Sequence, residues 1–143
     1  MTSVADITVG EQLPALSIYG DPTFVVSTAL ATRDFQDVHH DRDLAQQRGS
    51  KDIFVNILTD TGLVQRFVTD WAGPRALITS IKLRLGVPWY AYDTLSLSGT
   101  VTSFDEALVT VAVVGKNSMG DHITAQVMLT FTPLTSTTAG DIE

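Results

Sequence analysis

Residues 53–71 read IFVNILTDTGLVQRFVTDW, and the spacing within this stretch decides the fold class. Apolar side chains recur there at intervals of three and four, which is the spacing of one face of an α-helix. The predicted stripe consists of Phe54, Ile57, Leu58, Thr61, Val64, Phe67, Val68 and Trp71. Ser50 or Asp52 can cap the helix start, and Gly73-Pro74 ends it. We therefore expect a central helix over about Ile53 to Trp71.

The pattern changes to strands after this helix. Alternating or β-branched segments, separated by turn-forming residues, occupy 76–85, 94–104, 108–114 and 122–132. One long helix followed by antiparallel strands predicts an α+β fold with a sheet wrapped around the helix. A hot-dog fold and cystatin-like folds both fit this order of elements.

The segment before the helix contains shorter elements. Residues 16–19 predict a strand that Gly20-Asp21-Pro22 closes, and 44–48 predict a short helix ended by Gly49. Periodicity does not decide between strand and helix for 23–32. The length of 143 residues fits one domain, which we place at 1–134, and the small polar residues of 135–143 predict a flexible tail.

Composition excludes several classes of function. The net charge is −7 and the nine basic residues are scattered, so a nucleic-acid surface is not expected. The absence of cysteine excludes disulfides, a thiol nucleophile and Cys-ligated metal sites. No segment approaches the roughly 18–20 apolar residues of a membrane span, and no signal-peptide pattern is present. We expect a soluble, cytoplasmic protein.

The polar segment 33–43, RDFQDVHHDRD, holds the candidate catalytic residues. Asp34 and His39 are five positions apart, and a loop can bring them to one point. A carboxylate and an imidazole together can hold a water, take its proton and return one to carbon. A solvated charged run competes with this interpretation. Metal binding by His39, His40 and Asp41 is disfavoured because adjacent residues point apart, and we expect no metal.

The string Asp34-Phe35-Gln36-Asp37-Val38-His39-His40-Asp41 resembles the hydratase motif D-x-N-P-[LIV]-H-x-D of the MaoC-like, R-specific enoyl-CoA hydratases. The resemblance covers about Leu16 to Thr132. It is strongest to the small subunits of actinobacterial steroid side-chain enoyl-CoA hydratases. Further strings carry it: GSKDIFVNILTDTGLVQR at 49–66, WAGP at 71–74, RLGVPWYAYD at 84–93 and GDH at 120–122.

This resemblance implies a hot-dog fold and the addition of water to a trans-2-enoyl-CoA, with a steroid side-chain thioester of cholesterol catabolism as substrate. It places Asp34 and His39 as the acid/base pair, and Val55, Asn56 and Gln36 around the thioester oxygen. Coenzyme A would enter as part of the substrate, with no separate cofactor. A second MaoC-like subunit would complete a heterodimer or heterotetramer.

Three positions depart from the family pattern. Gln36 and Asp37 replace the Asn and Pro of the motif, and Asn56 stands where the family has Gly at the helix start. These departures keep a non-catalytic hot-dog subunit open as an alternative, and a hot-dog thioesterase is a second one.

Other aromatic and histidine side chains predict packing roles. We expect Trp71 in the core, His40 either behind the site or exposed, and His122 at the surface, while Trp89 fits either the core or a pocket wall.

Overall fold

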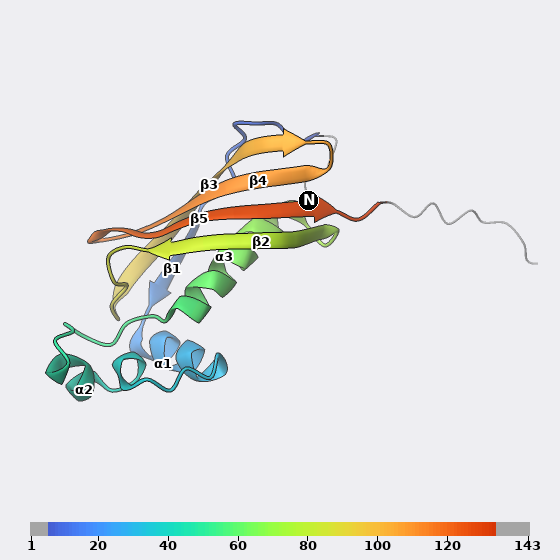
Figure 1. The fold of residues 1–143 in the computed structure, drawn as a ribbon. Helices are drawn as coiled ribbons and strands as arrows, with labels where there is room; N and C mark the ends of the chain where they lie inside the picture. Colours follow the sequence, from blue (N-terminus) through green and yellow to red (C-terminus); the bar gives the residue numbers. More distant parts are fainter. Residues whose placement is uncertain (1–5, 134–143) are drawn as a thin grey trace, which may run out of the picture.

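The computed structural model describes residues 6–133, and the predicted tail at 135–143 lies outside this range. Five antiparallel strands form one sheet in the order β1-β3-β4-β5-β2, and the long helix α3 lies against one face of it (Figure 1). The elements in chain order are β1 (Leu16–Gly20), α1 (Pro22–Ala31), the 3₁₀ turn η2 (Asp37–His39), α2 (Arg42–Gln47), α3 (Ile57–Ala72), β2 (Ala76–Leu85), β3 (Asp93–Asp105), β4 (Leu108–Asn117) and β5 (Gly120–Phe131).

The core lies between α3 and the sheet. Alternate residues of the three central strands point toward the helix, as the strand period requires, and they are fully buried. Phe67 of α3 packs so closely on β3 that a Cβ at Gly99 would lie 2.7 Å from its Cε1 atom. Gly99 therefore permits the distance at which the helix packs on the sheet.

The predicted start of the central helix is wrong by four residues. Residues 53–55 are extended, because Val55 N–H donates to the Trp89 carbonyl at 3.0 Å and Ala91 N–H donates to the Ile53 carbonyl at 3.0 Å. The cap is Asn56, whose side chain accepts from the N–H of Thr59, rather than Ser50 or Asp52. The apolar run at 53–55 is buried against a strand-like segment, which explains why it resembled a continuation of the helix face.

The first turn of α3 also differs from the prediction. Ile57 and Leu58 are 49% and 51% exposed, so the buried side of α3 begins at Thr59 and Asp60 and continues through Val64 and Phe67. The predicted end is confirmed, since Gly73 takes a φ of +84° directly after the helix.

The segment 23–32, for which the sequence left strand and helix open, is helical and belongs to α1 (Pro22–Ala31), with Thr32 as its C-cap. Asp21 caps this helix by accepting from the N–H of Phe24 at 2.7 Å, and Pro22 occupies its first position. After the helix, Arg33 adopts a left-handed conformation with φ of +58°. The N–H of Asp34 donates to the carbonyl of Ala29 at 2.9 Å, so the helix end fixes the backbone at Asp34.

The predicted strands 16–19, 76–85, 94–104, 108–114 and 122–132 are confirmed as β1 to β5, with boundaries shifted by at most three residues. The short helix before Gly49 is confirmed as α2, and Gly49 takes a φ of +92°. Across the described range 6–133, no helix is long and apolar enough to cross a membrane.

Candidate active site

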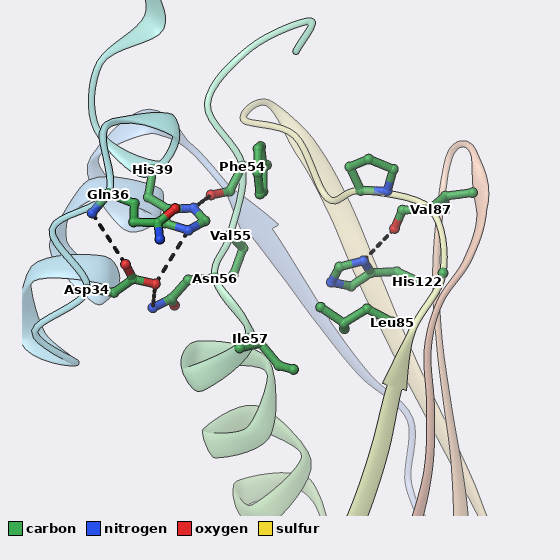
Figure 2. Close-up of a pocket in the computed structure, with 12 residues that line it drawn as sticks. Asp34, Gln36, His39, Phe54, Val55, Asn56, Ile57, Leu85, Val87 and His122 are labelled. Atoms are coloured by element: carbon green, nitrogen blue, oxygen red, sulfur yellow. Dashed lines mark hydrogen bonds and ion pairs between the residues drawn. The ribbon is translucent and has the colours of Figure 1, made fainter. Parts of the chain in front are cut away.

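A cavity of about 420 Å³ opens between the start of α3, the η2 segment and the connection from β2 to β3. Figure 2 shows Asp34, His39 and Asn56 on one wall, and Leu85, Val87 and His122 on the wall across from it. The complete lining is Asp34, Gln36, His39, Phe54, Val55, Asn56, Ile57, Leu85, Gly86, Val87, Pro88 and His122. All five site residues predicted from the sequence line this one cavity.

Asp34 and His39 face each other within the cavity. The Oδ2 atom of Asp34 lies 3.4 Å from Nε2 of His39 (Figure 2). This separation is longer than an ordinary hydrogen bond of about 2.7–3.2 Å. Each of the two atoms can therefore form a hydrogen bond to a further group in the cavity. Oδ1 of Asp34 accepts weakly from the backbone N–H of Gln36 at 3.3 Å.

The orientation of the His39 ring is fixed from its far side. Nδ1 lies 2.7 Å from the carbonyl oxygen of Phe54, and a carbonyl only accepts, so Nδ1 carries a hydrogen. In the neutral ring, Nε2 is then the basic nitrogen, and it is the one that points at Asp34. The Phe54 ring packs edge-on against His39, with ring centroids 4.8 Å apart. The ring is therefore held in one tautomer and one orientation.

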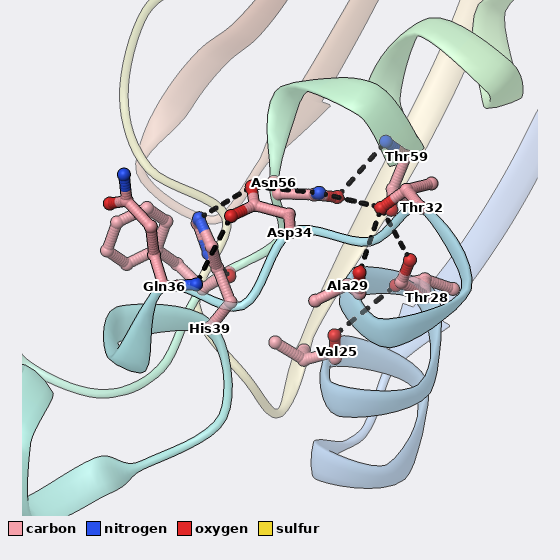
Figure 3. A network of polar contacts seen from close by, with 10 residues as sticks. Val25, Thr28, Ala29, Thr32, Asp34, Gln36, His39, Asn56 and Thr59 are labelled. Atoms are coloured by element: carbon pink, nitrogen blue, oxygen red, sulfur yellow. Dashed lines mark hydrogen bonds and ion pairs between the residues drawn. The ribbon is translucent and has the colours of Figure 1, made fainter.

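Asn56 connects the start of α3 to the carboxylate of Asp34 (Figure 3). Its Nδ2 donates to Oδ2 of Asp34 at 3.1 Å and to Oγ1 of Thr32 at 2.9 Å, while its Oδ1 accepts from the backbone N–H of Thr59 at 3.1 Å. Glycine, the family residue at this position, has no side chain to make any of these bonds. The departure from the motif adds a positioning group for Asp34.

The other two predicted site residues contribute in different ways. Val55 is buried and lines the cavity with its side chain, but its N–H already donates to the Trp89 carbonyl, so it is not a free donor. The N–H groups at the very start of a helix have no intrahelical partner, which leaves those of Asn56 and Ile57 available. Gln36 is exposed at the cavity rim.

The acidic residue that replaces the motif proline lies outside this cavity. Asp37 accepts from Arg48 at 2.7 Å, and this bond holds the pKa of its carboxyl below the ordinary value. His40 is exposed, which is one of its two predicted positions. Within residues 6–133, no group of three or more His, Asp or Glu side chains is arranged to hold a metal ion.

The sequence prediction missed a second acid–imidazole pair. His122 was expected at the surface, but it is 2% exposed, and its Nε2 lies 3.0 Å from Oδ1 of the fully buried Asp60. The connection from β2 to β3 folds over the start of β5 and covers His122, which explains the difference. One signal was present in the sequence: Asp60 falls on the apolar stripe of α3, four positions before Val64.

Comparisons with known proteins place this geometry in a family. No family model matches the chain. The chain is 74% identical, over 121 residues, to the 3-oxo-4,17-pregnadiene-20-carboxyl-CoA hydratase beta subunit of Mycobacterium tuberculosis, covering 85% of this chain and 94% of that protein. The chain belongs to the MaoC-like hydratase family.

Solved structures agree with this assignment. The structure matches the crystal structure of the ChsH1–ChsH2 complex from Mycobacterium tuberculosis with a TM-score of 0.86 and 72% identity, over 87% of this chain and 98% of that one. The (R)-hydratase from A. caviae involved in PHA biosynthesis matches with a TM-score of 0.82 at 18% identity, over 89% of this chain and 98% of that one. The predicted hot-dog fold is confirmed.

Proposed function

We propose that this MaoC-like chain is the catalytic subunit of an enoyl-CoA hydratase, with Asp34 and His39 as the acid/base pair. The observation that carries the proposal is the 3.4 Å separation of the Asp34 carboxylate and His39 Nε2 inside the cavity. A water in the cavity that faces both atoms donates a hydrogen bond to each of them. The His39–Phe54 contact keeps Nε2 in the tautomer that receives such a bond.

Hydration then requires one new C–O bond and one new C–H bond. The water oxygen bonds to the β-carbon while the C=C π bond and one O–H bond of the water break. One partner of the pair takes the proton that the water loses, and the pair delivers a proton to the α-carbon. Negative charge develops on the thioester oxygen during this step. The N–H groups of Asn56 and Ile57 at the start of α3 are the donors that stabilise it, supported by the positive end of the helix dipole. Coenzyme A is part of the substrate, and no further cofactor takes part.

The substrate we propose is a steroid side-chain enoyl-CoA, because the 74% identical relative bears the name of such a hydratase. The comparison with solved structures supports a second hot-dog subunit as partner, since the matching crystal structure is the ChsH1–ChsH2 complex. Ile57 and Leu85 line the cavity and are 49% and 37% exposed, which leaves apolar surface at its mouth for a partner to cover.

The test is an absorbance assay that follows loss of the conjugated enoyl thioester of 3-oxo-4,17-pregnadiene-20-carboxyl-CoA. This chain, a ChsH2-type partner, and the two together are compared. Asp34→Asn and His39→Ala in the assembled complex are each expected to lower kcat by at least about a hundredfold, the scale of acid–base catalysis. The matched control is His40→Ala, which changes the adjacent, exposed imidazole and is expected to keep wild-type kcat.

Two results would contradict the proposal. Full activity of both variants in an intact complex would make this chain a non-catalytic subunit. Release of free thiol at the rate of absorbance loss would identify a thioesterase instead.

A further inference from the structure

His122 lines the wall of the cavity across from Asp34 and His39 and pairs with Asp60, which is buried behind that wall, and hydration as proposed does not use this pair. Asp60 belongs to α3 and His122 to β5, and their side chains meet at 3.0 Å in the interior. Their exposed fractions are 0% and 2%. A buried acid–imidazole pair lowers the free energy of unfolding unless hydrogen bonds compensate for its desolvation.

The hydrogen bonds of His122 show that the pair holds one proton between its members. Nδ1 lies 2.6 Å from the carbonyl oxygen of Val87, so Nδ1 carries a hydrogen (Figure 2). Nε2 and Oδ1 of Asp60 then attract each other only if a proton lies between them, on either atom. Without it, two lone pairs would face each other.

The surroundings favour retention of this proton. Oδ2 of Asp60 is buried and has no hydrogen-bond partner within the part of the chain that the structure describes. Burial raises the pKa of the Asp60 carboxyl. For His122, burial alone would lower the pKa, but the hydrogen bond and the charge of Asp60, together with the bond to the Val87 carbonyl, raise the pKa overall.

The pair connects three elements that form opposite sides of the cavity. Asp60 is one turn along α3 from Asn56, the residue that orients Asp34. The backbone carbonyl of His122 accepts from the N–H of Gly86 at 2.8 Å, and the Nδ1 of its ring donates to the carbonyl of Val87. One imidazole therefore ties α3 to the segment 85–88.

We propose that Asp60 and His122 are positioning residues whose shared hydrogen bond sets the distance between the start of α3 and the wall formed by 85–88. This proposal deepens the hydratase function above and rests on it. In the proposed hydration the start of α3 holds the thioester oxygen, and the wall formed by 85–88 lies across the cavity from it. Their separation aligns the double bond with Asp34 and His39.

The test compares variants of this chain in the assembled complex. The double variant Asp60→Leu/His122→Phe replaces the pair by apolar side chains, an exchange that is often neutral or stabilising for folding. Asp60→Asn keeps a hydrogen bond, because its amide donates to Nε2 of a neutral His122. Asp70→Asn, on the exposed side of the same helix beside Arg66, is the matched control.

The double variant is expected to keep the Tm of the wild type and to lose on the order of ten- to a hundredfold in kcat, with little change in KM, because misalignment acts on the chemical step. Amide hydrogens of residues 86, 87 and 89–91 are expected to exchange faster in it. Asp60→Asn and Asp70→Asn are expected to keep both kcat and protection within about threefold.

A folded double variant with wild-type kcat would overturn the proposal, since a purely structural pair would be replaceable. NMR of the unaltered protein supplies a measurement that does not depend on that variant folding. A slowly exchanging, strongly downfield Nε2 proton on His122 supports the proposal, and a solvent-exchanged His122 ring would overturn it. Absence of hydration by the wild-type complex would instead contradict the proposed function, while the exchange and NMR experiments would still test the connection between the walls.

Discussion

Asn56 combines two tasks at the residue scale. Its side-chain Oδ1 caps α3 and its side-chain Nδ2 donates to Asp34, so one side chain connects the helix start to the Asp34 carboxylate. Asn56→Ala removes both bonds. We expect a loss of about 1 kcal/mol in the free energy of unfolding from the missing cap. We also expect a fall in kcat on the order of tenfold, because Asp34 loses a hydrogen bond to a charged group.

Asn56→Asp separates these two contributions. An aspartate still caps the helix, so any loss of stability in urea unfolding comes from burial of a second carboxylate beside Asp34 and not from a missing cap. It places a second carboxylate against Asp34 instead of a donor, so kcat in the enoyl-thioester assay should fall further than in Asn56→Ala. Wild-type kcat in Asn56→Asp would show that the amide does not position Asp34.

How well single residues could be predicted depends on how local their contacts are. Asp34 and His39 were predicted as a pair because they belong to one loop and their spacing matches a motif. His122 and Asp60 are 62 positions apart, and only the packing of β5 on α3 brings them together. The same holds for Val55, whose N–H is occupied by a carbonyl from another segment. Contacts of this kind have no signature in spacing.

At the scale of elements, strands and helix ends were predicted better than the start of α3. Alternation and turn residues determine strands locally, and Gly73-Pro74 ends a helix by its own backbone chemistry. The apolar composition of 53–55 fits both a helix and an extended segment. Its backbone hydrogen bonds with 89–91 make it extended. The tertiary partner of this segment was not visible in the periodicity.

The packing of α3 on β3 makes a prediction at this scale. Gly99→Ala places a Cβ 2.7 Å from the Phe67 ring, and we expect a loss of about 1–3 kcal/mol from overpacking. Phe67→Leu removes the ring atom, so the double variant should be less destabilised than the sum of the two single variants. Urea unfolding of the three variants measures this coupling.

Gly62→Ala is the matched control for Gly99→Ala. Gly62 lies within α3, and a Cβ there meets no atom within 4 Å, so we expect a gain of about 0.5–1 kcal/mol from helix propensity. Additive losses in Gly99→Ala and Phe67→Leu would contradict the close contact between helix and sheet.

On the scale of the whole molecule, the free energy of unfolding has two contributions from titrating groups that change with pH in opposite directions. Burial acts to raise the pKa of Asp93, but hydrogen bonds from Ser118 and the N–H of Thr94 outweigh it and lower the pKa. This contribution is present above the ordinary carboxyl pKa of 3.8 and is lost on acidification. The pKa values of Asp60 and His122 are both raised, so their contribution is present at low pH and is lost as the pH rises.

Asp60→Asn should reverse the sign of the second contribution. In the wild type, the folded state holds a proton on the pair that the unfolded His122 releases near its ordinary pKa of 6.5, so the free energy of unfolding falls as the pH rises above that value. In the variant, His122 has no charged partner and remains buried, which lowers its pKa. Below pH 6.5 the unfolded state then binds more protons than the folded state, so stability should rise with pH up to about that value and level off above it.

Urea unfolding of both proteins at several pH values on either side of 6.5 measures this effect. The difference between the two curves isolates the pair, because every other titrating group is common to both proteins. A slope of the same sign in wild type and variant would show that Asp60 and His122 hold no common proton in the folded state.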